Sequence, residues 1–550
     1  VMRERGEAEF ILYDPIGRVA VCGITADGLP QTVPVMTARY DSGNIAGSIG
    51  DTGYTVPSDL DWSDITITRV NYYDSYDCLQ QKGFASLPAE NFTPDLDTAK
   101  GMLVAARTAY YTHSDSGYDV SGTDESLYSV YCYDKEGRVT TEVSSTIIEG
   151  IYHTVTHGYS RQGHETECTE HINVTEPQCL LKRTTEYDAL GNILSATAVM
   201  GSGSSLNPGT VRSPEYIYDE LGRLSQVRAG ITVGYRYDMR GRLTGISHPA
   251  FSQTIEYESG RSPRYNGNIS EITTSRNDEY PDIRIFGYDR LNRLTSMSSV
   301  YRFSTQYSYD LNSGPLTIRR SGLLSDGTVG VVDDLSLTYD GNRLIKVTDD
   351  ADPVLLERSC DFYGQESVYG YNADGALYSD TSRGIEAIEY APAGQPVAIR
   401  DADGILIARY AYSADGRRLS SGYSTVPGQE PTGNRHFIGS FEVFKYDRDI
   451  MNRTMLERIR IPWGEILYDN TALLHMRDYQ GNVCAVIEPV SGGVAQTTEY
   501  YPYGLPTASS TGQVQNTYKF SGKTFEAYRG MNRYDFHARQ YDPALGLFDR

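Results

Sequence analysis

The chain has 550 residues, too many for one ordinary compact core, which splits beyond roughly 250–300 residues, so it holds several domains or an architecture that grows by repetition. Its 45 tyrosines favour β-structure and its 53 glycines favour frequent turns, which excludes long helices and coiled coils. The net charge of −23 argues against nucleic acid as a partner, and no apolar run approaches the ~18 residues that a membrane-spanning helix needs.

The two ends and the cysteines carry few signals. The first residues, VMRERGEAEF, contain no apolar stretch typical of a secretory signal. The chain stops at Arg550 in mid-pattern, so we expect it to be part of a longer protein. Its seven cysteines form no C-x-x-C pair and are odd in number, which argues against a disulfide framework.

Residues 20–130 contain few clear repeats, and we predict decorated strands or a small cap there. Within them, LDTAKGMLVAARTAYY at 96–111 is the candidate helix. Lys100 and Arg107 interrupt its apolar residues, so we expect it to pack on the surface of the molecule and to stay out of a membrane.

Residues 153–179 concentrate side chains that can bind metals, namely His153, His157, His164, Cys168, His171 and Cys179. Imidazole and thiolate suit zinc, and four such ligands could close a structural site. The spacings match no standard zinc finger, and Cys168 stands where a zinc-protease motif has its second histidine. We favour an inserted hairpin with polar residues and name no metal ligand. Zinc is the alternative, which metal analysis of the purified protein decides.

One short phrase recurs along the chain and organises the rest of it. It reads YDPIGR at 13–18, YDKEGR at 133–138, YDALGN at 187–192, YDELGR at 218–223, YDMRGR at 237–242 and YDRLNR at 288–293, with looser copies down to YSADGR at 412–417. Adjacent copies lie about 20 residues apart, a period that holds two strands of about five to eight residues and two tight turns. The sequence therefore predicts an all-β fold of antiparallel hairpins stacked side by side.

The phrase also specifies the turn of each hairpin. Its Asp can bond the backbone two residues on, and its Gly accepts a left-handed conformation, so we predict positive φ at Gly191, Gly222, Gly241 and Gly416. The Tyr before each turn falls at a fixed place, so the rings of stacked units should form a ladder. The Arg or Asn after Gly is placed to bond carboxylates or backbone carbonyls of a neighbouring unit.

These Y-D-x-x-G-R/N-L repeats resemble the YD repeats of the Rhs family, whose relatives include the teneurins and the insecticidal toxin-complex subunits. Four later segments together resemble the Rhs-associated core domain: RDYQGNVCAVI at 477–487, EYYPYGLP at 499–506, YKFSGKTFE at 518–526 and GMNRYDFHARQYDPALGLF at 530–548. We therefore divide the chain into a divergent N-terminal repeat region with insertions (1–180), regular repeats (181–430) and a core domain truncated at its C-terminus (431–550).

The resemblance implies a hollow shell of spiralling hairpins that encloses a C-terminal polypeptide, often a toxin, with the core domain plugging one end. Stacking in register leaves only two sheet edges, which is consistent with such a shell. We expect a non-enzymatic bacterial shell, secreted or at the cell surface, with no cofactor. It would encapsulate and deliver an effector of the same longer chain in competition between bacteria, with secretion-apparatus or immunity proteins as further partners.

Two other functions are weighed against the shell. A surface protein whose tyrosine faces bind carbohydrate or cell wall is the alternative. An enzyme within residues 20–180 ranks last, because no arrangement of nucleophile and base can be named there.

In the relatives that cleave themselves, two aspartates beyond the R-Y-Y-x-P segment cut the chain before the toxin. RQYDPALGLF at 539–548 matches that segment, so Arg539 aligns with the arginine that supports cleavage. The sequence Asp542-Pro543 lies earlier than the catalytic Asp-Pro, and Asp549 is followed by Arg550. The resemblance thus places both catalytic aspartates beyond residue 550. A structural ion pair is the other interpretation of Arg539.

Two short segments resemble nucleotide-binding motifs, but each lacks a glycine that the motif requires. Residues 522–524 have the tail of a phosphate-binding loop, but Thr517 stands where the first glycine belongs. GSGSS at 201–205 is expected to be a flexible turn, with Leu206 in place of the third glycine of a dinucleotide fingerprint.

Overall fold

The computed structural model describes residues 8–25, 37–45, 48–56, 65–114, 117–122, 125–174, 179–202, 205–206, 214–248, 250–276, 280–300, 302–324, 326–352, 362, 364–447, 453–489, 491–511 and 516–549. Cys360 lies outside these residues, and none of the six described cysteines forms a disulfide.

Within the described residues, 25 strands form one antiparallel sheet in which strands that follow each other along the chain are mostly neighbours. Its first part contains β1 Ala8–Tyr13, β2 Val19–Thr25, β5 Ile65–Tyr73, β6 Leu103–Thr108, β9 Leu127–Tyr133, β10 Val139–Ser145, β11 Tyr152–Tyr159, β12 Glu165–Ile172, β13 Cys179–Tyr187, β14 Ile193–Ser202 and β15 Ser205–Leu206. Its second part contains β16 Glu215–Tyr218, β17 Leu224–Arg228, β18 Thr232–Tyr237, β19 Leu243–Ser247, β20 Ser252–Glu256, β21 Glu271–Ser275, β22 Asp282–Tyr288, β23 Leu294–Ser299, β24 Ser304–Tyr309, β25 Pro315–Leu323, β26 Val329–Asp340, β27 Arg343–Asp349, β28 Glu366–Tyr371 and β29 Leu377–Asp380.

A second antiparallel sheet follows the first along the chain, and the two sheets together form what is called here the wall of the molecule. It contains β30 Ala387–Tyr390, β31 Pro396–Arg400, β32 Leu406–Ser413, β33 Arg418–Tyr423, β34 Gly433–Ile438, β35 Phe441–Tyr446, β36 Thr454–Ile461, β37 Gly464–Leu467, β38 Ala472–Arg477, β39 Val483–Ile487 and β40 Val494–Thr497, together with β7 Tyr110–Ser114 and β8 Gly117–Val120. Because β7 directly follows β6 along the chain and pairs with β32, it joins the early strands of the first sheet to the second sheet.

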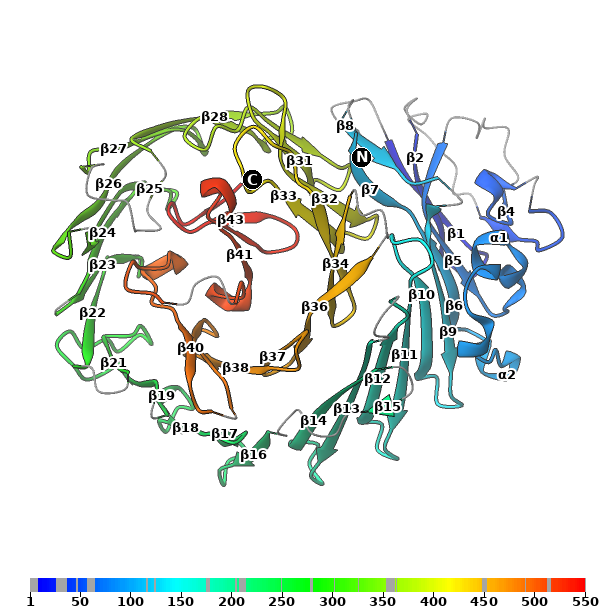
Figure 1. Ribbon diagram of the computed structural model, residues 1–550, viewed down its shortest axis with the longest axis horizontal. Helices are drawn as coiled ribbons and strands as arrows, with labels where there is room; N and C mark the ends of the chain where they lie inside the picture. The colour runs from blue at the N-terminus through cyan, green and yellow to red at the C-terminus, as the bar shows by residue number, and fades with distance from the viewer. Residues whose placement is uncertain are drawn as a thin grey trace.

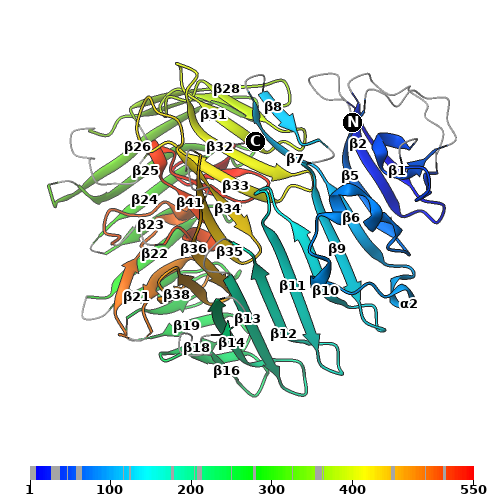
Figure 2. The ribbon, with the colours of Figure 1, turned by 45° about the vertical axis from the view of Figure 1, so that its right-hand side comes forward.

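Two smaller sheets complete the described strands. β3 Arg39–Tyr40 pairs with β4 Tyr54–Thr55, and β41 Thr524–Glu526, β42 Arg533–Asp535, β43 Gln540–Asp542 and β44 Leu547–Phe548 form a sheet near the C-terminus. Figure 1 shows the two large sheets curving into a ring, with β36 to β40 turning inward and β41 to β44 inside the ring. Figure 2 shows the strands side by side along the wall. The predicted all-β fold of stacked antiparallel hairpins curling into a shell is confirmed.

The strands follow from the alternation of the sequence and from a bulge that recurs before the turns. In β12, Cys168, Glu170 and Ile172 are buried and the residues between them are partly exposed, as expected for one packed face. The pairing shifts by one residue at the tyrosine of the repeat, for example between Arg236 and Tyr237. Such a bulge raises the local twist and so contributes to the curvature of the wall.

The helix predicted over residues 96–111 is wrong for most of its length. Helix α2 covers only Leu96–Ala99, after which Gly101 takes a φ of 82° and β6 and β7 follow. Pairing of β6 with both β5 and β9 outweighs the local helical preference, because it buries Val104 within the sheet.

The described helices are short. α1 covers Lys82–Ala85, and the 3-10 turns are η1 Ile49–Asp51, η2 Asp77–Gln80, η3 Ala89–Asn91, η6 Pro502–Gly504, η7 Phe520–Gly522 and η8 Tyr528–Gly530. Figure 1 shows α1 and α2 on the side of the sheet that faces away from the ring interior. No helix in the described part of the chain is long and apolar enough to span a membrane.

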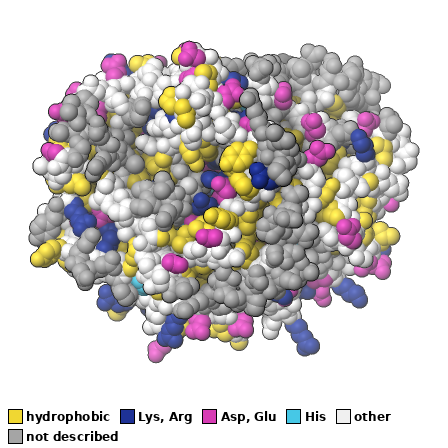
Figure 3. All heavy atoms as spheres, in the orientation of Figure 1, with side chains coloured by type: hydrophobic (Ala, Val, Ile, Leu, Met, Phe, Trp, Pro, Cys, Tyr) yellow, Lys and Arg dark blue, Asp and Glu magenta, His cyan; other side chains and the backbone are white. Residues whose placement is uncertain are grey.

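The largest hydrophobic core lies where the inside of the ring meets the end of the chain. It joins residues of the wall, such as Ile318 and Val347, to Leu505, Met531 and Leu545. Figure 3 shows hydrophobic side chains gathered over the middle of the ring, with many charged side chains around its margin. The C-terminal residues therefore pack against the inner side of the ring.

Candidate functional site

In the repeat turn at 218–223, Asp219 fixes both the backbone and the arginine of its own turn. Its Oδ1 accepts the backbone N–H groups of Leu221 (3.0 Å) and Arg223 (2.9 Å), and its Oδ2 accepts the Nε–H of Arg223 (2.7 Å). The backbone N–H of Arg223 is the main reason that the pKa of Asp219 is lowered. The same aspartate–arginine pattern recurs at Asp14–Arg18, Asp134–Arg138, Asp238–Arg242 and Asp289–Arg293.

The repeat turn at 218–223 is also bonded to its neighbours on both sides. The hydroxyl of Tyr218 donates to the backbone carbonyl of Ile193 (2.9 Å) in the preceding hairpin. Arg223 Nη1 donates to the carbonyl of Asp238 in the next turn (3.0 Å), and its guanidinium lies 5.0 Å from the ring centre of Tyr237. Equivalent hydroxyl bonds are made by Tyr73, Tyr133, Tyr159, Tyr187, Tyr257, Tyr288, Tyr309, Tyr339, Tyr371 and Tyr390.

These contacts refine two expectations about the repeats. The tyrosines form a ladder of hydroxyl-to-carbonyl bonds, and in several turns an arginine lies over the tyrosine ring of the next repeat. The arginine that ends the repeat phrase bonds the carboxylate of its own turn and the carbonyl of the next one, as at Arg223, which follows Gly222, and at Arg293, which follows Asn292. The turn therefore holds itself and its neighbour with one side chain.

The turn glycines have the predicted backbone conformation. Gly191, Gly222, Gly241 and Gly416 have φ values of 86°, 74°, 81° and 87°. The flexible turn expected at 201–205 is wrong at its start, because Gly201 lies in β14 opposite Leu180 of β13. Pairing with β13 continues through this glycine, so the strand is longer than its turn-like composition indicates. Gly203 lies outside the described residues.

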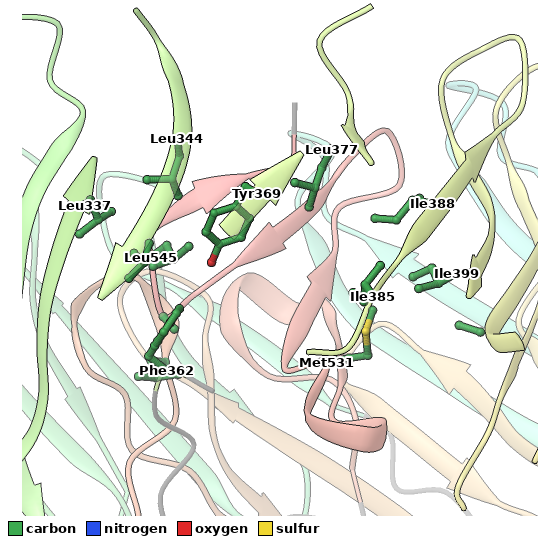
Figure 4. Close-up of a cluster of buried hydrophobic side chains, with 14 of the residues drawn as sticks. Leu337, Leu344, Phe362, Tyr369, Leu377, Ile385, Ile388, Ile399, Met531 and Leu545 are labelled. Carbon is green, nitrogen blue, oxygen red and sulfur yellow. The ribbon is translucent and has the colours of Figure 1, made fainter. Parts of the chain in front are cut away.

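The C-terminal segment, defined here as residues 499–549, packs against the inner face of the ring. Figure 4 shows Met531 and Leu545 of this segment among Leu344, Ile385 and Ile388 of the wall. Apolar packing of this kind favours the contact, while buried charges paired across it fix the position of the segment. Four groups of charged side chains join the two surfaces.

The first group centres on Arg320 of β25, which is 1% exposed. Its Nη1 donates to Asp333 Oδ2 (2.5 Å) and its Nη2 donates to the backbone carbonyl of Ala544. Asp333 Oδ1 in turn accepts the backbone N–H of Phe362 (2.9 Å). A buried guanidinium is tolerated because each of these partners compensates for lost water.

The second group centres on Arg383, which pairs with Asp380 of the wall (2.7 Å) and with Asp542 of the C-terminal segment (2.8 Å). Arg533 of the segment reaches back to the same Asp380 (3.1 Å). Burial alone would raise the pKa of Asp380, but the two guanidinium groups outweigh it and hold this pKa well below its usual range. Each side of this contact therefore supplies an arginine that pairs with an aspartate of the other side.

The third group centres on Arg418 of β33, whose Nη1 pairs with Glu526 Oε1 (2.7 Å) and with Asp535. The hydroxyl of Tyr410 donates to Glu526 Oε2 (3.0 Å), and Gln540 Nε2 donates to the oxygen of Tyr410 (3.1 Å). Burial and the carboxylate of Glu526 raise the pKa of Tyr410 well above its usual value, so its hydroxyl remains a donor.

The fourth group lies beside a cavity of about 290 Å³ between β21–β23 and the segment. Glu499 pairs with Arg276 and with Arg302 (3.2 Å). Arg284 and Tyr500 are among the residues that line the cavity. In all four groups the charges of one surface are matched by charges or carbonyls of the other, an arrangement that fixes a segment in place.

Comparison with known proteins agrees with the geometry of the turns. The model of the family described as RHS Repeat matches residues 218–250, which contain two of the turns described above. Residues 218–250 thus match the RHS repeat. The chain is similar in fold to the solved structures titled "Crystal Structure of TcdB2-TccC3" and "Crystal Structure of TcdB2-TccC3-Cdc42", each with a TM-score of 0.50, 14% sequence identity and coverage of 100% of this chain and 33% of the other.

The chain therefore spans about a third of the length of the solved chains that it resembles. No curated protein matches it.

Arg539 and Asp542 lie in the last hairpin of the C-terminal segment. Arg539 is exposed, and its guanidinium carbon lies 4.0 Å from the ring centre of Phe548. Asp542 is buried, where it pairs with Arg383 and its Oδ1 accepts the backbone N–H of Ala544 (3.0 Å). Asp542 therefore helps to hold the C-terminal segment against the inner face of the ring. A supporting part for Arg539 in self-cleavage stays a prediction.

The histidines and cysteines between 153 and 179 do not converge on one point. His153 approaches Glu170 (3.3 Å), His164 stacks on Tyr187, and His171 faces Leu180. Cys179 lies at the start of β13, opposite Ile172. Of the six residues, the structure places His157 and Cys168 directly opposite each other, with Glu165 as a third neighbour.

The anchoring arginines were missed because a surface arginine and a buried one look alike in a single sequence. One signal was present. In β25, Ile318 and Arg320 share the buried face of an alternating strand, while Arg319 points to the exposed face. An arginine at an inward position of a strand indicates a buried acceptor, which here is Asp333.

Proposed function

We propose that the chain forms part of the wall and the inner plug of a β-shell that encloses a polypeptide effector, without being catalytic itself. The observation that carries this proposal is the anchored C-terminal segment inside a ring of RHS-repeat hairpins. The effector is proposed to be a toxin of the same longer chain, with residues 431–550 acting as the core domain.

The bonding between repeats supports a role as a container. In the described part of the regular repeats, most neighbouring hairpins are held together by backbone pairing, and many also by a tyrosine hydroxyl or an arginine. Such a wall presents few free edges to the interior or to solvent, so an unfolded polypeptide inside it has few strands with which to pair.

The biological setting belongs to the same proposal. We infer secretion or display at the surface of a bacterium, use in competition between bacteria, and secretion-apparatus or immunity proteins as partners. The fold likeness to TcdB2-TccC3 is compatible with this setting and supports the shell architecture.

Carbohydrate binding through the repeat tyrosines is less well supported by the geometry. The hydroxyl of Tyr218 donates to a backbone carbonyl, and the guanidinium of Arg223 lies over the ring of Tyr237 in the next repeat. A sugar would need a free ring face and free hydroxyl groups at such positions. The tyrosines of the repeat are therefore better explained as part of the wall.

Protease protection of the natural longer protein tests the shell. We expect the polypeptide that follows residue 550 to be digested at least roughly tenfold more slowly within the intact protein than when it is produced alone, with peptides followed by mass spectrometry. Equal digestion rates would overturn encapsulation. Micromolar binding on a glycan array, together with equal digestion, would support the carbohydrate alternative instead.

A further inference from the structure

His157 and Cys168 are brought together by the pairing of β11 with β12. They are direct partners across the two antiparallel strands, so their side chains leave the same face of the sheet. The pairing then shifts by one residue between Gly158 and Tyr159, which makes Glu165 the partner of Tyr159. In a strand without this shift, residues 165 and 168 would point to opposite faces.

The three side chains offer a nitrogen, an oxygen and a sulfur to one point. His157 Nδ1 lies 2.5 Å from Glu165 Oε1, and the ligand atoms of His157, Glu165 and Cys168 all lie within 4.8 Å of one another. Cys168 is buried, whereas the side chain of Glu165 is 43% exposed. One side of the group is therefore protein and the other is open to water.

We propose that His157, Glu165 and Cys168 bind one zinc ion, with water in the fourth position. Imidazole nitrogen, thiolate sulfur and carboxylate oxygen are the three kinds of ligand that zinc takes in proteins, and four-coordinate sites with three protein ligands keep one open position. A neutral imidazole with a thiolate and a carboxylate balances the double charge of the ion. A soft thiolate also disfavours magnesium and calcium at this point.

Arg183 of β13 supplies the outer contact that such a site needs. Its Nη2 donates to Cys168 Sγ (3.0 Å) and to Glu170 Oε1 (2.7 Å). A donor to the sulfur orients it and stabilises its negative charge, as partners of metal ligands commonly do. Glu170 also accepts the backbone N–H of Ser440 (2.8 Å), so the proposed site lies beside the contact between the two large sheets.

Cobalt(II) provides an optical probe of this site. Protein stripped of metal under reducing conditions should bind about one equivalent of Co²⁺ with a near-ultraviolet sulfur-to-cobalt band, and one equivalent of Zn²⁺ should remove that band. Cys168→Ser should abolish the band. Glu165→Gln, at an exposed position that the fold tolerates, should weaken Co²⁺ binding by roughly tenfold or more.

Two matched variants separate the site from its surroundings. His164→Ala alters a histidine outside the group, and Cys22→Ser alters a thiol on a distant strand, so both should retain the band and the affinity. Absence of the band in the unaltered protein, or its persistence in Cys168→Ser, would overturn the proposal. An equal loss of affinity in His164→Ala and Glu165→Gln would overturn it as well.

Discussion

At the scale of the residue, arginine and asparagine after the turn glycine differ in what they can join. Asn192 makes the bond to the carboxylate of its own turn, at 2.8 Å from Asp188, just as Arg223 does with Asp219. Only the longer arginine also reaches the next turn, at Asp238. The next repeat tyrosine after Tyr187 is Tyr218, 31 residues further along, yet the two repeats are adjacent in space, because the Tyr218 hydroxyl donates to the carbonyl of Ile193. Asn192 therefore fixes its own turn, and the tyrosine of the next repeat supplies the contact between the two.

Replacing Gly222 by valine tests whether positive φ is what the turn requires. A Cβ at this position meets nothing within 4 Å, so any cost comes from the backbone φ of 74°. We expect Gly222→Val to lower the free energy of unfolding by about 1–3 kcal/mol, seen as a lower denaturant midpoint. Gly122→Val is the matched control, because that glycine is equally unhindered and has no positive φ. Equal shifts in the two variants would contradict the assigned turn.

At the scale of the element, the sequence predicts the hairpins well and the irregular region poorly, for one physical reason. The phrase around Asp219 contains its own turn, bulge and contacts, so it can be read without knowing the rest of the fold. Residues 96–111 have no such local determinant. Their structure depends on β5 and β9, which pair with β6 from elsewhere in the chain. The division at residues 180 and 430 stays a prediction.

Tyr288 tests the ladder of hydroxyl bonds. Its hydroxyl donates to the carbonyl of Ile269 (3.0 Å), and burial raises its pKa to about 12. Tyr288→Phe leaves that carbonyl without this donor, which should cost about 0.5–1.5 kcal/mol. Amide hydrogen exchange in β21 and β22 should then be roughly 2- to 10-fold faster. Tyr265→Phe, at a residue that is 76% exposed, should leave exchange unchanged, and faster exchange there would contradict the ladder.

At the scale of the whole molecule, acid should loosen the C-terminal segment through Asp380. The folded-state pKa of this carboxyl lies below its ordinary 3.8, so its stabilising effect is complete above that value and is lost as the pH falls through the folded pKa. Between pH 5 and pH 2, the free energy of unfolding should fall more steeply in the unaltered protein than in Asp380→Asn. Asp374→Asn, an exposed turn residue nearby, should keep the steep dependence. Parallel curves for the protein and Asp380→Asn would contradict the assignment.

The adjacent arginines of β25 allow the buried anchor to be tested against a surface ion pair on the same strand. Arg320 is buried with Asp333 and holds the carbonyl of Ala544, whereas Arg319 pairs with Asp334 (2.7 Å) at side chains that are 53% and 36% exposed. Removing Arg320 leaves the buried carboxylate of Asp333 without its ion-pair partner. Arg320→Met should therefore lower the free energy of unfolding by about 3–5 kcal/mol. Arg319→Met should cost less than about 1 kcal/mol.

The location of the damage distinguishes an anchor from a general core residue. If Arg320 fixes the C-terminal segment, limited proteolysis of Arg320→Met should open cleavage sites within residues 499–549 first, while the hairpins from β16 to β24 remain resistant. Loss of resistance throughout the wall at the same rate would mean that Arg320 holds the sheet itself together. Unchanged proteolysis in both variants would mean that apolar packing around Leu545 is sufficient to hold the segment, since this packing is untouched by either substitution.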